Sequence, residues 1–109
     1  MEAKTPQQFF DEILPLRFQP EKAKGIDVTV QVNIMGAMGG DWMVEIKDKK
    51  LKVEKGTYSS PKLKVEVSDA DFLDIVNERL SAQKAFFLGK IRFKGDLTLA
   101  LKLRDAGFL

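Results

Sequence analysis

The sequence contains no cysteine and no histidine. Without cysteine there are no disulfide bonds, no thiolate nucleophile and no cysteine-based zinc site. Without histidine the chain lacks the commonest general base at neutral pH, and every Ser-His-Asp or Cys-His catalytic arrangement is excluded. The two absences together argue against an enzyme, and we expect a protein with no catalytic residues, no metal and no cofactor.

Long hydrophobic runs are missing as well. No stretch of about eighteen apolar residues is present, so the sequence predicts no transmembrane helix. The opening residues, MEAKTPQQFFDE, are acidic and lack a continuous apolar segment, so they are not typical of a signal peptide. We therefore expect a cytoplasmic protein. A chain of 109 residues that is 44% hydrophobic and 31% charged is typical of one folded domain, here over residues 1–109.

The net charge is only +2, but the charged residues are unevenly distributed. The C-terminal part carries a set of cations that we call the basic rim: Lys84, Lys90, Arg92, Lys94, Lys102 and Arg104. These residues are either an ordinary solvated surface or a contact for anionic membranes and acidic ligand groups. Nucleic acid is not expected as a partner, because lysines elsewhere alternate with Glu45, Glu54 and Glu66 instead of forming one basic field.

The N-terminal segment carries the signals of a helix. Thr5 is a suitable N-cap, Pro6 suits the first helical position, and Gln8 completes a capping box. Pro15 is expected to end this helix. Residues 20–25 then predict a second short turn, which begins at a proline and ends at a glycine.

Four segments show the alternation of a β-strand. Residues 26–34 alternate apolar and polar side chains without a break, which is the strongest strand pattern in the chain. Shorter alternating segments at 42–46, 51–53 and 63–67 predict three further strands. Because one side of each segment is apolar and the other polar, we expect a mainly antiparallel sheet with one face in water and one covered.

The C-terminal part predicts helices and one more strand. Ser68 and Ser81 are suitable N-caps, the second helix ends at Gly89, and residues 90–94 predict a short strand. The segment from Leu97 fits two structures, because its leucines alternate as in a strand while its composition and the preceding Gly-Asp favour a helix. In the helical alternative, which is slightly favoured, one face comprises Leu97, Ala100, Leu101 and Arg104.

Polar motifs give weak signals for chemistry. Three glycines within residues 36–40 have neither Walker nor dinucleotide-binding spacing and are typical of a hairpin loop. Asp69 and Asp71 lack the later ligands of a calcium loop, so they fit a solvated helix N-terminus. Asp74 and Glu78 share a helix face without a partner base, as surface carboxylates do.

The apolar residues are more informative than the polar ones. Large apolar side chains gather in residues 83–103, QKAFFLGKIRFKGDLTLALKL, and all predicted strands and helices add more to one sheet face. A plain hydrophobic core accounts for any single one of them. Helices laid over one sheet face also leave gaps lined by apolar atoms, and such gaps bind apolar ligands. Both interpretations remain open at this level.

The C-terminal half, SDADFLDIVNERLSAQKAFFLGKIRFKGDLTLALKL, resembles the sterol carrier protein type 2 family. The family pattern starts a helix with Ser-Asp-x-Asp-Phe, here residues 68–72, and continues with a short Gln-Lys-Ala-Phe helix, here within residues 81–87. A Gly-Lys strand follows at residues 89–95, and a Gly-Asp start of a final helix follows it. The segment FQPEKAKGIDVTVQVNIMG is similar to the family's Phe-Asn-Pro-Glu segment before strand one, so the resemblance covers nearly the whole chain.

The resemblance implies an α+β fold: a five-stranded mixed, mainly antiparallel sheet covered on one face by helices, with an apolar lipid tunnel between them. It implies that the last segment is a helix that closes the tunnel. It also implies non-enzymatic binding and transfer of a lipid, which is a fatty acid, a fatty acyl-CoA or a sterol-like ligand. The alternative is an accessory domain that docks on a lipid- or acyl-CoA-metabolising enzyme.

The tunnel implied by this resemblance would be lined by apolar residues of the sheet and of all three C-terminal helices. The expected ligand-binding residues are Val44, Ile46, Val53, Phe72, Ile75, Val76, Leu80, Phe86, Phe87, Leu88, Leu97 and Leu101. Of the neighbours Phe86 and Phe87, one should face the core and the other the tunnel. Leu88 stands where the family often has glutamine, which makes the tunnel more apolar and a fatty acid or acyl-CoA the favoured ligand. Without ligand, we expect residues 97–109 to be mobile.

Overall fold

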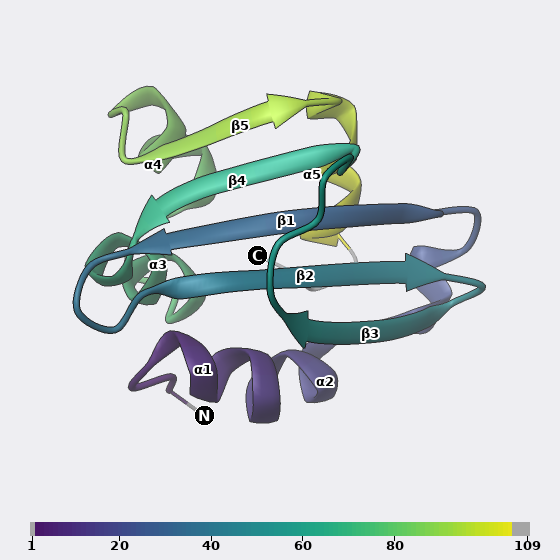
Figure 1. Ribbon diagram of the computed structural model, residues 1–109, viewed down its shortest axis with the longest axis horizontal. Coiled ribbons are helices and arrows are strands. Elements are labelled where there is room, and N and C mark those ends of the chain that lie inside the picture. The colour runs from purple at the N-terminus through teal and green to yellow at the C-terminus, as the bar shows by residue number, and fades with distance from the viewer. Residues whose placement is uncertain (1, 106–109) are drawn as a thin grey trace.

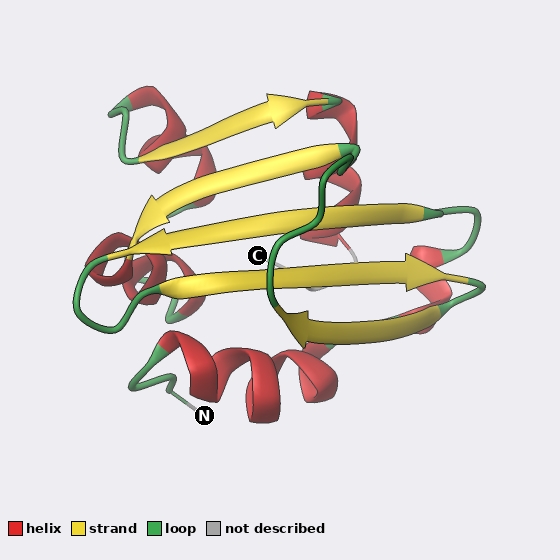
Figure 2. Ribbon diagram, viewed as in Figure 1, coloured by secondary structure: helices red, strands yellow, loops and turns green. Residues whose placement is uncertain are grey.

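The chain folds around one five-stranded sheet, with helices on one of its faces (Figure 1, Figure 2). The computed structural model describes residues 2–105. The strands are β1 (Val28–Met35), β2 (Gly40–Lys47), β3 (Lys50–Lys55), β4 (Leu63–Ser68) and β5 (Ile91–Gly95). They lie in the order β3-β2-β1-β4-β5; β1 and β4 are parallel, and the other neighbours are antiparallel. The predicted mixed, mainly antiparallel sheet is confirmed.

The helices begin where the sequence placed their caps. They are α1 (Pro6–Gln8), the π-helix η1 (Phe9–Ile13), α2 (Leu14–Arg17), the 3-10 helix η2 (Pro20–Ala23), α3 (Asp69–Val76), α4 (Ala82–Phe87) and α5 (Leu97–Asp105). Thr5, Ser68 and Ser81 each accept a hydrogen bond from the backbone N–H three residues later, at 3.0 to 3.1 Å. The last segment is a helix, so its two alternatives are resolved as the resemblance implied.

The N-terminal helix does not end at Pro15, and that prediction was wrong. The helical path runs on into α2 because the middle turn, η1, is a π-helix, in which the N–H of Leu14 donates to the carbonyl of Phe9. This wider turn accommodates the ring of Pro15, which falls in the first turn of α2. A proline costs little there, since the first N–H groups of a helix have no intrahelical partner.

The first strand is shifted by two residues from its predicted start. The N–H of Ile26 donates to the carbonyl of Ala23 at 3.0 Å and closes the turn after η2, so Ile26 is buried but does not pair in the sheet. At the other end, β1 extends to Met35, which lies opposite Ser68 of β4. The alternation of apolar side chains thus located the strand, and hydrogen bonding decided its ends.

The main core lies between the sheet and the N-terminal helices. Four buried rings form what we call the closed cluster: Phe9 and Phe10 of η1, Trp42 of β2 and Phe72 of α3. Phe10 stacks on Trp42 with ring centroids 4.9 Å apart, and Phe9 meets Phe72 edge-on at 5.4 Å. These are the arrangements that aromatic pairs prefer. The closed cluster therefore joins the first helical segment to the middle of the sheet.

The sequence predicted that the opposite face of the sheet lies in water, but part of this face is covered. The connection from β3 to β4 crosses this face in front of β2 and β1 (Figure 1). Gln31 of β1 is buried beneath it, with 3% of its surface exposed. Its Nε2 donates to the carbonyls of Trp42 at 3.2 Å and Gly56 at 3.0 Å, and its Oε1 accepts the N–H of Tyr58. The amide side chain of Gln31 thus holds the middle of the crossing loop, and backbone hydrogen bonds from Gly56 to Asp41 and from Lys62 to Thr29 hold its two ends.

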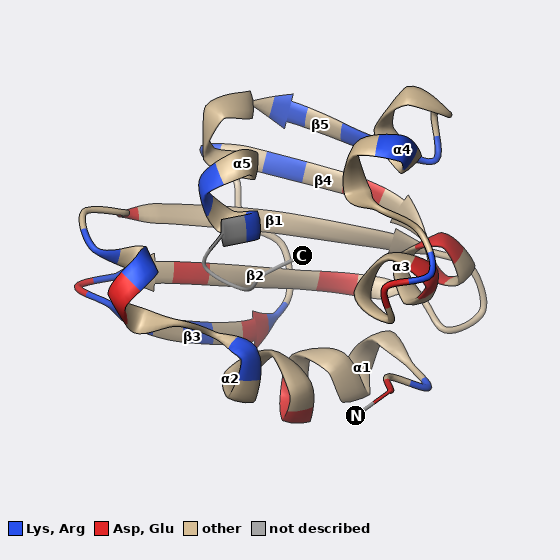
Figure 3. Cartoon of the chain, turned by 180° about the vertical axis from the view of Figure 1, so that it is seen from behind, with Lys and Arg blue, Asp and Glu red and all other residues tan. Residues whose placement is uncertain are grey.

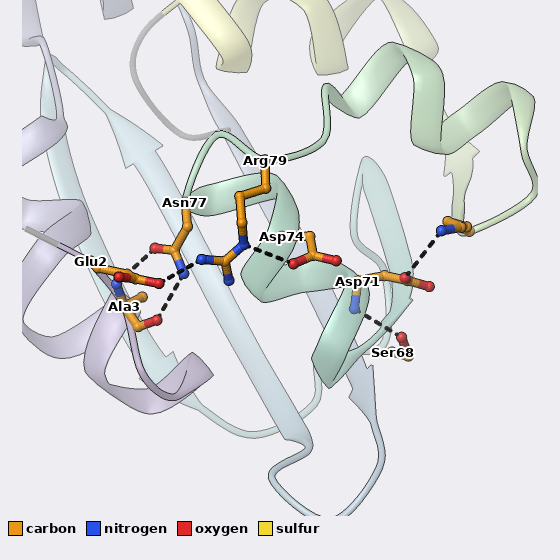
Figure 4. A network of polar contacts seen from close by, with 8 residues as sticks. Glu2, Ala3, Ser68, Asp71, Asp74, Asn77 and Arg79 are labelled. Carbon is orange, nitrogen blue, oxygen red and sulfur yellow. Dashed lines mark hydrogen bonds and ion pairs between the residues drawn. The ribbon is translucent and has the colours of Figure 1, made fainter.

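The N-terminus is tied to the end of α3 by polar contacts (Figure 4). Arg79 donates to Glu2 at 2.6 Å and to Asp74 at 3.1 Å, and hydrogen bonding to Glu2, then to Asp74, raises the pKa of Arg79. Asn77 exchanges two hydrogen bonds with the backbone of Ala3, at 2.7 and 2.8 Å. These contacts hold the first helical segment beside α3, and the closed cluster lies between these two helical segments and β2.

Candidate functional site

A groove of about 500 Å³ opens on the helical face of the molecule, between α4, β5 and α5. We call it the α4–α5 groove. Most of its lining residues are apolar: Ala82, Gln83, Phe86, Phe93, Leu97, Ala100, Leu101 and Arg104. Figure 3 shows α4 and α5 on this face, at the end of the sheet that β5 forms. Within the described residues the apolar space is therefore an open groove, and a closed tunnel stays a prediction.

The wall of the groove on one side is built by α4 and β5. Ala85 is fully buried and anchors α4 against the core, which turns the next residue, Phe86, toward β5. The ring of Phe86 lies 5.8 Å from the ring of Phe93, centroid to centroid. Phe93 is partly buried because strand alternation directs it to the helical face. The two rings form an apolar surface at the edge of the sheet.

The opposite wall is the face of α5 that helical spacing predicted. Leu97, Ala100 and Leu101 recur at i, i+3 and i+4, so they lie on one side of the helix, where they line the groove. Leu103 is on another face and is buried against the core, which fixes the helix. Asp96 caps α5 by accepting the N–H of Thr98 at 3.0 Å, and hydrogen bonding to the hydroxyl and the N–H of Thr98 lowers the pKa of Asp96.

The prediction for Phe86 and Phe87 was wrong in one respect. Neither ring faces the core: Phe86 lines the groove with 45% of its surface exposed, and Phe87 points outward with 77% exposed. The reason is the short length of α4, which has one fully buried position, and Ala85 occupies it. Leu88 is also exposed and does not line the groove.

Several predicted ligand-binding residues pack in the core, away from the groove. These residues are Val44, Ile46, Val53, Phe72, Ile75 and Val76; Val53 is partly buried and the others are buried. They belong to β2, β3 and α3, which are outside the three elements that form the groove. The structure therefore brings together Phe86, Leu97 and Leu101 from the predicted set. A ligand contact by any of these residues stays a prediction.

A second hollow of about 740 Å³ adjoins the groove and is more polar. Leu80 and Ile75, both in the predicted set, border it together with Arg17 and Glu78, and the two hollows share Ala82 and Arg104. Arg17 donates to the carbonyl of Val76 at 2.7 Å, so one end of this hollow is fixed. Leu80 is thus placed next to the groove without lining it.

Sequence reasoning missed some of the groove residues. The lining residues that it did not propose are Ala82, Gln83, Phe93, Ala100 and Arg104. The helical face inferred from Leu97 already contained Ala100 and Arg104, and strand alternation placed Phe93 on the covered side. No comparable signal pointed to Ala82 or Gln83, because a short surface helix has no clear inner face.

Charged groups surround the groove on its outer sides. On the sheet face opposite the helices, Lys94 of β5 pairs with Glu66 of β4 at 3.2 Å, and this hydrogen-bonded pair lowers the pKa of Glu66. Lys90, which follows α4, lies 4.0 Å from Asp71 of α3. Among the described residues no group of acidic side chains is arranged to hold a metal ion. Both lysines thus lie near carboxylates, and the charged residue that lines the groove itself is Arg104, so the groove is an apolar surface with a basic residue at its border.

Residues 10–106 match the SCP-2 sterol transfer family. The chain belongs to this family. It is 35% identical over 85 residues to peroxisomal multifunctional enzyme A of Dictyostelium discoideum, and 30% identical over 70 residues to human sterol carrier protein 2. The matches cover 76% and 64% of this chain but 19% and 13% of those two proteins. The chain thus spans less than a fifth of the length of these curated relatives.

The family assignment agrees with the fold. The structure of palmitated SCP2L2 from Aedes aegypti superposes with a TM-score of 0.76 at 31% identity, covering 93% of this chain and 92% of that one. The resemblance inferred from the sequence is confirmed, and the chain is a domain of the SCP-2 sterol transfer family. Between residues 2 and 105, none of the helices has the length and apolarity needed to cross a membrane.

Proposed function

We propose that the domain binds a fatty acid or fatty acyl-CoA in the α4–α5 groove and transfers it without catalysing a reaction. The observation that carries the proposal is the groove itself, whose apolar walls come from three elements of the SCP-2 fold. Its volume of about 500 Å³ lies within the range of small-molecule sites, roughly 300 to 1,000 Å³. A relative of similar fold has been described in a palmitated form.

The expected affinity follows from apolar burial. Complete burial of an acyl chain of about sixteen carbons is worth on the order of 13 kcal/mol, at about 0.8 kcal/mol per methylene. Ordering of the chain and loss of overall freedom remove several kcal/mol, which leaves roughly micromolar affinity. An open groove buries only part of the acyl chain, which lowers this gain. Closure of the groove around the ligand would bury more of the chain and strengthen binding. In that case α5 should be more mobile in the empty protein than in the complex.

A titration with a fluorescent fatty acid tests the proposal. Leu101→Asp places a carboxylate in the groove and should weaken binding by about tenfold or more, because the charge loses hydration beside an acyl chain. Met35→Asp is the control, since Met35 is an exposed apolar residue of β1 that lines neither hollow. Absence of saturable binding, or equal binding by both variants, would reject the groove as the site. Mass spectrometry of lipids extracted from the purified protein identifies the natural ligand.

The accessory-domain alternative has one observation in its favour. The match to peroxisomal multifunctional enzyme A covers 19% of that enzyme, so related domains occur within larger enzymes. In that case the domain would supply a lipid to a partner enzyme, and the same groove would be used. Faster turnover of an acyl-CoA by a co-purifying enzyme when the domain is added would support this role; unchanged turnover would contradict it.

The remaining parts of the proposal concern location and ordering. We propose a cytoplasmic protein, which fractionation of cells producing a tagged chain would test. Hydrogen exchange with and without fatty acid tests the predicted ordering of α5; residues 106–109, which belong to that prediction, lie outside the described residues. Equal protection of residues 97–103 in both states, with binding confirmed, would show that the groove is preformed.

A further inference from the structure

The C-terminal end of α4 presents two large apolar side chains to the solvent. Phe87 has 77% of its surface exposed and Leu88 has 56%. The local backbone holds them there. The N–H of Leu88 donates to the carbonyl of Lys84 and ends the helix, and Gly89 then turns the chain with a φ of 73°. We call Phe87 and Leu88 the α4 tip.

The exposure of the tip follows from the way α4 is anchored. Ala85 is fully buried, and successive residues are about 100° apart around a helix, so Phe87 lies about 200° from the buried position. Its ring therefore points away from the core. Phe86, between them, lines the α4–α5 groove. Adjacent rings thus serve two surfaces, one inside the groove and one outside the molecule.

The tip lies beside several basic residues, two of which are close to carboxylates: Lys90 lies 4.0 Å from Asp71, and Lys94 lies 3.2 Å from Glu66. In sequence it lies between Lys84 and Lys90, and β5 adds Arg92 and Lys94 on the other face of the sheet. Figure 3 shows basic residues on α4 and β5 at this edge of the molecule, with acidic residues on the neighbouring α3. An aromatic and a leucine side chain surrounded by lysine and arginine are the composition of a membrane-interface anchor. The charge favours bilayers with anionic headgroups.

We propose, building on the proposed lipid transfer, that the α4 tip inserts into the headgroup region of an anionic phospholipid bilayer. Insertion of Phe87 and Leu88 would place the neighbouring Phe86 and the groove against the membrane surface. An acyl chain would then pass between bilayer and groove with little of its length exposed to water. The basic rim orients this edge toward the bilayer, and the apolar tip holds it there.

Co-sedimentation with vesicles tests the insertion. Wild-type protein should bind vesicles of phosphatidylcholine mixed with phosphatidylserine more tightly than vesicles of phosphatidylcholine alone, and salt should weaken binding. Phe87→Ser should reduce binding to the mixed vesicles by about tenfold, since an inserted aromatic side chain is lost. Leu16→Ser is the matched control, because Leu16 is 76% exposed but lies on α2. Absent vesicle binding, or equal loss in both variants, overturns the proposal.

Fluorescence gives an independent measure of depth. The native Trp42 is buried, so Phe87→Trp adds the one exposed indole among the described residues. Brominated anionic vesicles should quench this indole, and they should not quench a Leu16→Trp variant. Equal quenching, or none, overturns the proposal.

Two further measurements separate the possible occupants of the tip. Sedimentation analysis would show self-association that Phe87→Ser abolishes if a second copy covers the tip, and that result overturns the proposal. Fatty-acid titration without vesicles should be unchanged by Phe87→Ser. Normal titration with lost vesicle binding supports insertion. Loss of fatty-acid binding in Phe87→Ser would place Phe87 in the groove and overturn its assignment to the membrane. Loss of fatty-acid binding already in the wild-type protein would reject the groove as the lipid site, and the vesicle experiments would then test the tip by themselves.

Discussion

Two groups of aromatic rings lie on the helical face of the same sheet, and they differ in what covers them. The closed cluster of Phe9, Phe10, Trp42 and Phe72 is buried between η1, α3 and β2. The rings around Phe86 lie over the edge strand β5 beneath two short helices, and they remain partly exposed. Both groups consist of aromatic rings, so the elements that cover the rings decide which group becomes core and which lines a groove.

The comparison separates stability from binding. Rings at the centre of a sheet find neighbours on every side, and their burial contributes to folding. Rings at an edge lack neighbours on one side, and a ligand that supplies the missing contacts gains the burial instead. The closed cluster should therefore respond to mutation through the free energy of unfolding, and the groove through ligand affinity.

The largest expected effect comes from breaking the closed cluster. Phe72→Ala removes a ring that contacts both Phe9 and Phe10, and it should lower the free energy of unfolding by about 3–5 kcal/mol. Urea denaturation followed by far-UV circular dichroism measures the change. Phe87→Ala is the control and should cost little, because its ring is exposed. A loss below about 1 kcal/mol for Phe72→Ala would contradict the role of the cluster as the main core.

The next effect concerns the support of the closed cluster from the other face of the sheet. Gln31 donates to the carbonyl of Trp42 and holds the crossing loop. Gln31→Leu should cost about 1–3 kcal/mol, because the carbonyl of Gly56 and the N–H of Tyr58 lose their buried partner. Proteolysis should also cut faster near residue 58. Unchanged stability and cleavage would show that water replaces the amide without cost.

A smaller effect on stability, but a clear effect on binding, is expected in the groove. Phe86→Ala should lower stability by less than about 1 kcal/mol, because nearly half of the ring is already exposed, and should weaken fatty-acid affinity by about tenfold. Phe87→Ala is the neighbouring control, with affinity unchanged. Calorimetric titration measures both. If Phe86→Ala lowers stability and leaves fatty-acid affinity unchanged, then Phe86 belongs to the core and does not bind the ligand.

The smallest expected effect is a pH dependence of the free energy of unfolding, which comes from an ion pair on β5, the edge strand that carries Phe93. The hydrogen bond and charge of Lys94 lower the pKa of Glu66, so the folded state favours the ionised carboxylate. The contribution is present above the pKa of the unfolded chain and is lost as pH falls through the lowered folded value. It should be slight, because one ion pair on the outer face of a sheet contributes little to stability. The stability difference between wild type and Glu66→Gln should shrink with falling pH; a difference independent of pH would exclude the carboxylate as its cause.

Local signals in the sequence determined the strands, the helix caps and the family. Thr5, Ser68 and Ser81 cap helices because a hydroxyl group accepts the same N–H in any context, and alternation over 26–34 requires a strand with one buried side. These patterns depend on neighbours within a few residues, so they were readable without a structure. The α5 face was readable for the same reason, once the segment was taken as a helix.

Only the tertiary structure decided which apolar residues are free to meet a ligand. Phe72 and Phe86 both follow capped helix starts, yet one is enclosed by η1 and the other faces a groove at β5. The burial of Gln31 and the continuation of the helix past Pro15 were likewise settled by the crossing loop and the π-helical turn. The burial of a side chain depends on contacts with segments far away in the sequence, and a local sequence pattern does not contain that information.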